Sequence, residues 1–168
     1  ALIMSARTKV EQEPNYTYVT ARILLDELRA EALSFLGVAE ESTQPEMDEY
    51  YPKALAAFID KGIELEMLDP KLKEYDLAKL GAAIEAERDY KFTYLGLQTL
   101  YDRYFIHSQD IRYELPQIFF MRVAMGLAAE ESQKEERAIE FYRLLSSFDY
   151  MSSTPTLFNS GTLRPQLS

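Results

Sequence analysis

The sequence predicts a mainly α-helical protein, and three of its features favour that fold class. Apolar residues recur at the three- and four-residue spacing of a helix along most of the chain. Strict alternation of apolar and polar residues occurs at 90–94 alone. Gly37 follows the first periodic segment, Pro70 follows the second, and Pro116 begins a later one, as helix-end signals do. With 168 residues, 47% of them hydrophobic, the chain is long enough to bury the core of one domain.

The first strong helical pattern lies between residues 21 and 36. Charged residues fill its other face, and Gly37 supplies a residue that can end the helix in the left-handed conformation. The acidic, proline-bounded segment 40–52 is predicted to be an exposed loop. The apolar stripe of this helix consists of Ala21, Leu24, Leu25, Leu28, Ala32, Phe35 and Leu36.

Three shorter patterns follow in the middle of the chain. Residues 55–63 predict a second helix that ends before Asp69-Pro70, because the residue before proline disfavours the helical conformation. Residues 77–84 predict a shorter helix. The alternating residues 90–94 suggest a brief strand or an extended bridge, and helical spacing resumes from 94 to 105.

The last third of the chain predicts two helices and a loop. Pro116 is suited to the first position of a helix, and residues 118–129 carry a single charge, Arg122, so this helix should be buried nearly all round. Residues 138–148 form a final amphipathic pattern, after which Ser, Thr, Pro, Asn and Gly predominate. We therefore expect a helical domain over 1–150 and a loop segment over 151–168.

Composition excludes several classes of function. The net charge of −10 repels phosphate backbones, so we expect no nucleic-acid partner. The most apolar stretch, 118–129, is too short to cross a bilayer, and no signal peptide is recognisable, which predicts a cytoplasmic protein without membrane contact. Cysteine is absent, which removes disulfides, thiolate metal sites and thiol nucleophiles.

Few polar residues form a recognisable site. The lone His107 has Tyr104 three residues before it and so lacks the Glu-x-x-His pattern of a helical metal centre; a surface position is expected, with no metal or cofactor in this chain. The acidic clusters 46–49 and 130–136 are interpreted as solvated surface. Residues 152–156, Ser-Ser-Thr-Pro-Thr, crowd hydroxyls and backbone N–H groups that can bind phosphate. On spacing alone, a hydroxyl-rich turn with a structural role is the better interpretation.

Two long stretches of sequence favour a functional role for residues 152–156 over a purely structural turn. RYELPQIFFMRVAMGLA at 112–128 and SSFDYMSSTPTLFNSGT at 146–162 resemble the large, catalytic subunits of class I ribonucleotide reductases, in the region that leads into their catalytic barrel. EPNYTYVTARILLDELRAEAL at 13–33, with ALIMSART before it, resembles the segment that follows the ATP-cone. YLGLQTLYDRYFIH at 94–107 resembles a helix between these regions, and 38–75 is the least diagnostic part.

The resemblance implies an oxidoreductase that reduces ribonucleoside diphosphates at the ribose 2′-OH. In the family a separate, metal-containing small subunit delivers the radical, thioredoxin or glutaredoxin supplies the dithiol reductant, and ATP, dATP and other dNTPs are effectors. The family residue before the proline of the Ser-Thr-Pro-Thr loop contacts the substrate. That position is Thr154 here, with Ser153 as a weaker neighbouring candidate. This chain would supply the N-terminal helical domain and one wall of the substrate site, next to the remainder of the large subunit.

The chain also departs from the family pattern. The family continues after Gln-Leu-Ser with Ser and then the first cysteine of the redox-active pair, whereas this sequence ends at Ser168. Without cysteine there is no thiyl radical and no dithiol, so the chain alone is predicted to be inactive. Both ends favour a piece of a longer protein, whether a truncated chain, a proteolytic product or a naturally split subunit. The alternative hypothesis is a stand-alone helical interaction module without catalytic activity.

Overall fold

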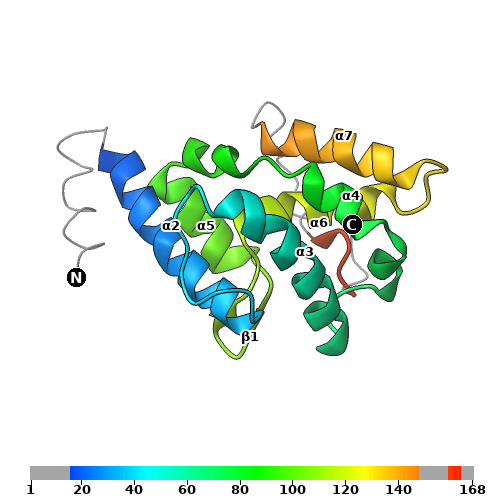
Figure 1. Cartoon of the computed structure of the whole chain (residues 1–168), viewed down its shortest axis with the longest axis horizontal. Helices are drawn as coiled ribbons and strands as arrows, with labels where there is room; N and C mark the ends of the chain where they lie inside the picture. Colours follow the sequence, from blue (N-terminus) through cyan, green and yellow to red (C-terminus); the bar gives the residue numbers. More distant parts are fainter. Residues whose placement is uncertain (1–15, 148–158, 164–168) are drawn as a thin grey trace.

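The computed structural model describes residues 16–147 and 159–163, and over this part the protein is mainly α-helical, as predicted (Figure 1). The long helices pack against one another, with short 3-10 helices and one small hairpin between them. In chain order the elements are α2 Tyr16–Phe35, α3 Met47–Glu64, η1 Pro70–Glu74, α4 Leu77–Ala82, η2 Ala86–Lys91, α5 Tyr94–Arg103, β1 His107–Ser108, β2 Ile111–Arg112, α6 Pro116–Ala128 and α7 Lys134–Ser146.

Helix α2 has the predicted apolar face and the predicted end. Leu24, Leu25 and Leu28 are at most 6% exposed and pack into the core. Gly37 has a φ of +74°, the left-handed conformation that closes a helix. The N–H of Val38 donates to the carbonyl of Leu33 at 2.9 Å, which satisfies a carbonyl that the helix end leaves free.

The prediction of an exposed loop over 40–52 is wrong in its second half. Helix α3 begins at Met47 and contains Pro52, and the side chains of Met47 and Tyr51 are fully buried. Proline removes one helical hydrogen bond, yet burial of two large side chains outweighs that loss. The acidic residues that suggested a loop, Asp48 and Glu49, lie on the exposed face of the first turn, where negative charge is favourable.

Of the two interpretations of 90–94, the brief strand is absent from the described part of the chain, whereas the extended bridge is confirmed at Phe92 and Thr93, whose backbone is extended. Residues 86–91 form the 3-10 helix η2, and α5 begins at Tyr94. Thr93 is the N-cap of α5, and its side chain accepts a hydrogen bond from the N–H of Gly96 at 3.2 Å. The buried Phe92 and Tyr94 and the exposed Tyr90 thus alternate because a turn and a helix cap follow one another.

A two-residue hairpin lies between α5 and α6. His107 pairs with Arg112 and Ser108 with Ile111 in antiparallel register. Gln109 and Asp110 between them both have positive φ, +49° and +70°, as a tight turn of type I′ requires. His107 is exposed, in agreement with its predicted surface position.

Helix α6 is the central element of the fold. Pro116 is its first residue, as predicted, and every side chain from Ile118 to Met125 is buried. Arg122 is among the buried residues, although it is charged. Helix α7 packs along α6 (Figure 1), at the position of the predicted final helix. Within the described residues, no helix is both long and apolar enough to span a membrane.

Replacing Phe120 by alanine tests the packing of α6. Phe120 is 4% exposed, its ring stacks on Phe92 at 6.0 Å, and the ring of Phe119 meets it edge-on. The cavity left by Phe120→Ala should lower the free energy of unfolding by about 3–5 kcal/mol, measured by denaturant titration. Leu95→Ala is the matched control, because Leu95 is 67% exposed and should matter little. A loss below about 1 kcal/mol for Phe120→Ala would contradict this packing.

Candidate functional site

A fully buried ion pair anchors α6 to the chain that precedes it. Nε of Arg122 lies 2.9 Å from Oε2 of Glu114, and Nη2 lies 2.9 Å from Oε1, so the carboxylate is bound by two parallel hydrogen bonds. Both side chains are 0% exposed. Glu114 also accepts a hydrogen bond from the N–H of Ile106 at 3.1 Å. The sequence showed Arg122 as a charge in an apolar helix but did not reveal its partner.

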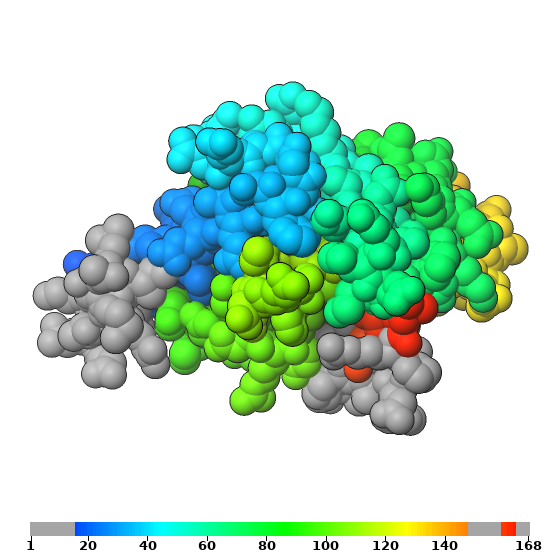
Figure 2. All heavy atoms as spheres, turned by 90° about the horizontal axis from the view of Figure 1, so that it is seen from below, coloured from blue at the N-terminus to red at the C-terminus, as the bar shows by residue number. Residues whose placement is uncertain are grey.

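The same arginine binds a segment that is distant in sequence. Nη1 of Arg122 donates to the carbonyl of Ser160 at 2.9 Å, and the hydroxyl of Ser160 donates to the carbonyl of Val123 at 3.0 Å. Ser160 is 2% exposed. We call residues 159–163 the docked segment; Figure 2 shows it in red at one face of the molecule.

Two glycines allow the docked segment to approach α6. A Cβ atom on Gly126 would lie 2.0 Å from Oγ of Ser160 and 2.3 Å from the backbone nitrogen of Gly161, which no side chain can tolerate. Gly161 has a φ of +82°, a conformation that favours glycine. Its carbonyl accepts a hydrogen bond from the N–H of Asp69 at 3.0 Å. Backbone therefore packs on backbone at this contact.

The docked segment also pairs with the chain that follows α3. Leu68 and Thr162 form an antiparallel bridge, and the N–H of Leu163 donates to the carbonyl of Met67 at 3.1 Å. These are the hydrogen bonds of a short β-ladder. The segment is therefore held on one side by α6 and on another by residues 67–69.

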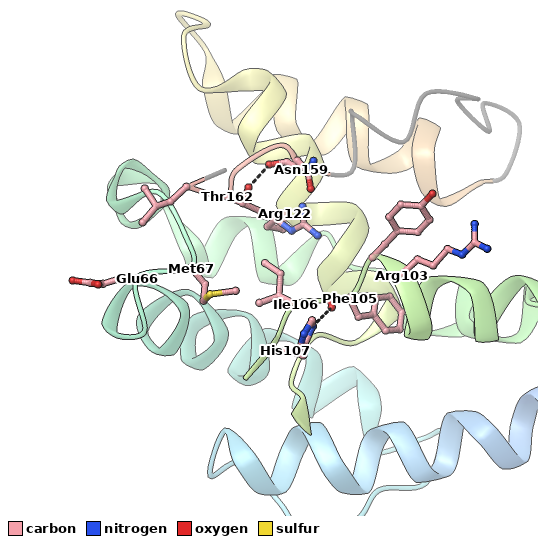
Figure 3. A pocket seen from close by; sticks show the side chains of 11 residues that line it. Glu66, Met67, Arg103, Phe105, Ile106, His107, Arg122, Asn159 and Thr162 are labelled. Carbon is pink, nitrogen blue, oxygen red and sulfur yellow. Dashed lines mark hydrogen bonds between the residues drawn. The ribbon is translucent and has the colours of Figure 1, made fainter. Parts of the chain in front are cut away.

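A cavity of about 220 Å³ lies beside the docked segment (Figure 3). Arg122, Asn159 and Thr162 border it on one side, and Ile106 and His107 border it on the other. Pockets that enclose a drug-sized ligand are commonly about 300–1,000 Å³. A space of this size can hold a side chain or part of a ligand.

The predicted substrate residues Ser153 and Thr154 lie outside the described residues. The described part ends at Ser147, just after α7, and resumes at Asn159, the first residue of the docked segment. The structure therefore shows the anchors on both sides of the hydroxyl-rich sequence and leaves the role of its hydroxyls as a prediction.

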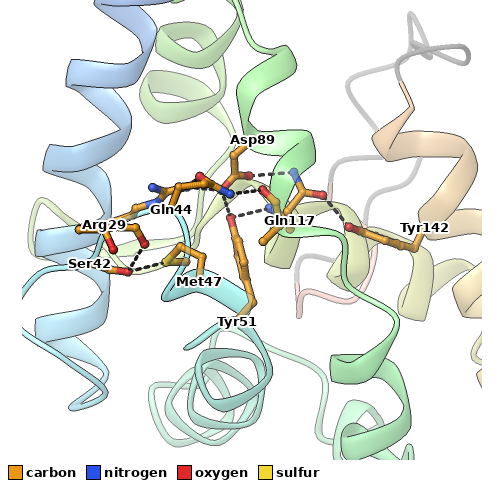
Figure 4. A network of polar contacts seen from close by, with 10 residues as sticks. Arg29, Ser42, Gln44, Met47, Tyr51, Asp89, Gln117 and Tyr142 are labelled. Carbon is orange, nitrogen blue, oxygen red and sulfur yellow. Dashed lines mark hydrogen bonds and ion pairs between the residues drawn. The ribbon is translucent and has the colours of Figure 1, made fainter. Parts of the chain in front are cut away.

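A second buried constellation centres on Asp89 (Figure 4). Its carboxylate accepts hydrogen bonds from Arg29 at 3.0 Å, Tyr51 at 2.7 Å and Gln117 at 2.8 Å. The hydroxyl of Tyr142 donates to the side-chain oxygen of Gln117 at 2.6 Å. Burial raises the pKa of Asp89, and the Arg29 guanidinium opposes that rise. Because donors surround the carboxylate and it has no exposure to solvent, this network joins helices rather than binding a ligand.

The acidic clusters offer no metal site in the part of the chain that the structure describes. There, no group of three or more histidine, aspartate or glutamate side chains could hold a metal ion. Glu130, Glu131 and Glu136 are exposed, in agreement with their interpretation as solvated surface. Lys79 forms an ion pair with Glu136, and such exposed pairs contribute little to stability.

Fold and site together define an all-α domain that fixes a distant chain segment against a buried helix. The family model for the all-alpha domain of ribonucleotide reductase matches residues 90–165. The whole chain is 47% identical to the alpha subunit of the ribonucleoside-diphosphate reductase of Chlamydia trachomatis. It is 38% identical to the alpha subunit of Helicobacter pylori over 99% of the chain, and 31% identical to the large chain of Schizosaccharomyces pombe over 98%.

The chain therefore belongs to the ribonucleotide reductase large-subunit family, as its sequence motifs indicated. It spans 16% of the length of the Chlamydia trachomatis relative, 20% of that from Helicobacter pylori and 19% of that from Schizosaccharomyces pombe. The docked segment lies within the stretch matched by the family model.

Replacing Asp89 by asparagine tests the structural role assigned to the second network. Asp89→Asn removes the negative charge that Arg29 is paired with and leaves only neutral hydrogen-bond acceptors, such as Gln44, beside a guanidinium that is 2% exposed. The free energy of unfolding should fall by about 3–5 kcal/mol in a denaturant titration. Asp26→Asn, at an exposed position of α2, is the control and should change it by less than about 0.5 kcal/mol. Equal losses for the two variants would mean that the network does not support the fold.

Proposed function

We propose that this chain supplies the helical domain and one wall of the substrate site of a ribonucleoside-diphosphate reductase large subunit. The complete subunit would reduce ribonucleoside diphosphates to deoxyribonucleoside diphosphates in the cytoplasm. It would need the remainder of the large subunit, a radical from a metal-containing small subunit, and thioredoxin or glutaredoxin as reductant. ATP, dATP and other dNTPs would regulate it. Within this chain the substrate contacts would come from Thr154 and, more weakly, from Ser153.

The anchoring of the docked segment carries this proposal. Four residues separate Thr154 from Asn159 in the sequence. Five peptide units span at most about 18 Å, so chain connectivity keeps Thr154 within that distance of the docked segment. Fixing the chain at residues 159–163 restricts the conformations open to the preceding sequence, which would lower the entropic cost of binding a ligand there.

The division of the chain also forms part of the proposal. Residues 1–150 would be the helical domain, and residues 151–168 would be the substrate-loop segment that leads into a catalytic barrel. Two hydrogen bonds join the two parts: Arg122 donates to the carbonyl of Ser160, and the hydroxyl of Ser160 donates to the carbonyl of Val123. Residues 159–163 of the loop segment are therefore held against α6, and the rest of the subunit would complete the pocket.

The 168-residue chain alone should not reduce nucleotides, even with the small subunit and a dithiol present. The reaction of this family needs cysteine both for the thiyl radical and for the reducing dithiol, and the chain has none. The measurement is deoxyribonucleotide formation by the purified chain, with a complete large subunit as positive control. Turnover by the rigorously purified chain would show that the family chemistry has been misassigned here.

Thr154→Ala tests the proposed substrate contact in the complete large subunit. If the Thr154 hydroxyl donates to the substrate diphosphate, its loss should weaken substrate binding by about 1.5–3 kcal/mol, as for other hydrogen bonds to charged groups. KM and the substrate dissociation constant are the measurements, and Thr154→Ser, which keeps the hydroxyl, is the control and should lose much less. If Thr154→Ala binds substrate as well as the wild type, or fails only because it unfolds, residues 152–156 would be assigned a structural role instead.

A further inference from the structure

We propose that Arg122, Glu114 and Gly126 are positioning residues for the substrate. They would act through the docked segment, which follows the Ser-Ser-Thr-Pro-Thr sequence and holds the chain on its C-terminal side against α6. This inference rests on the proposed function, because it assumes that Thr154 contacts the substrate. None of the three residues would touch the substrate itself.

The first step is the geometry of the guanidinium. Two nitrogen atoms of Arg122 bind the two carboxylate oxygens of Glu114, and this pairing fixes the plane of the guanidinium group. Its Nη1 then points at a fixed place, where it donates to the carbonyl of Ser160. Full burial strengthens each of these bonds because water does not compete for them. A lysine at this position would offer a point charge and could not reproduce the fork.

The second step is the surface of α6 around that arginine. Arg122 and Gly126 are four residues apart and therefore lie on the same face of the helix. Between them the carbonyl of Val123 accepts the hydroxyl of Ser160, and the missing side chain of Gly126 leaves the space that Ser160 and Gly161 occupy. The Arg122 donor, the Val123 carbonyl acceptor and the space at Gly126 thus follow one another along α6 where the docked segment packs. The docked segment fits this face in a single register, since a shift by one residue would misplace each contact.

The third step is the consequence for the reaction. A hydrogen bond weakens steeply when its donor is displaced or misaligned, so a small shift of the Thr154 hydroxyl would weaken its bond to the substrate. Moving the docked segment would change the limit that chain connectivity to Asn159 places on the position of Thr154. The effect should therefore appear in substrate binding, and it should depend on the presence of the Thr154 hydroxyl.

The experiment is a double-mutant cycle in the complete large subunit, assayed with its small subunit. Gly126→Ala forces Ser160 and Gly161 outward, since the added Cβ would overlap them. It should raise KM for the ribonucleoside diphosphate about tenfold, the equivalent of one hydrogen bond, while kcat at saturation changes less than about twofold. In the Thr154→Ala background the same substitution should raise KM less than about twofold, because the contact that it misplaces is already absent.

Two further variants separate positioning from general destabilisation. Gly81→Ala places a Cβ 3.0 Å from the Cα of Pro52, which also crowds backbone, but on α4 and without contact to the docked segment in the described structure. It should leave KM unchanged. Ser160→Ala removes the hydroxyl bond to Val123 and keeps the carbonyl that Arg122 binds. It should raise KM about threefold, a part of one hydrogen bond, and it decides the question if Gly126→Ala does not fold.

The possible outcomes distinguish the two proposals. An equal rise in KM from Gly126→Ala in both backgrounds would show that the glycine acts independently of Thr154, and would overturn the positioning role. The positioning role would also be overturned if Thr154→Ala raises KM but folded Gly126→Ala leaves KM unchanged. If Gly126→Ala does not fold, the same test applies to Ser160→Ala. If Thr154→Ala alone leaves KM unchanged, the proposed function itself fails, and the positioning role fails with it.

Discussion

The buried guanidinium of Arg122 determines which segments of the chain pack against α6. An isolated buried ion costs several kcal/mol, so the fold must bring an acid and further acceptors to it. Glu114 supplies the acid from the extended chain before α6, and Ser160 supplies a carbonyl from the docked segment. Two stretches of chain are thus held against the helix by one side chain. Apolar packing alone would bury α6 but would not select these two neighbours.

Asp89 imposes a similar constraint on another face of the same helix. Gln117 binds Asp89, and it lies five residues before Arg122, which places the two side chains about 140° apart around the helix axis. Helix α6 therefore has polar anchors in two directions, with apolar contacts between them. Such a pair of satisfied networks fixes both the rotation of a helix and its position along its axis, whereas a uniformly apolar surface tolerates several packings.

The sequence predicted the elements whose signals are local. Helical spacing, a proline at position 116 and a glycine at position 37 located most helices and two of their ends, because each reports on its own backbone. The loop prediction failed over 47–52, and the strand interpretation of 90–94 failed, because tertiary contacts decide the outcome in both places. Met47 starts a helix because a buried place exists for it in the core. The aromatic alternation after residue 89 mimicked a strand because a short turn and a helix cap happen to have the same spacing.

The sequence placed Arg122 in a buried helix but did not predict the docked segment that it binds, and the reason is physical. A single charge in an apolar helix already implies a buried partner, so Arg122 carried a usable signal for an acid such as Glu114. Its other acceptor, the carbonyl of Ser160, lies 38 residues away and belongs to the backbone, which every residue has. Sequence can mark such a contact only through the residues that make room for it. Gly126 and Gly161 make that room. A Cβ atom on Gly126 would collide with the docked segment, and Gly161 adopts a positive φ. A glycine inside a buried helix, four residues after a buried arginine, is therefore a signal for a second backbone packed on that face.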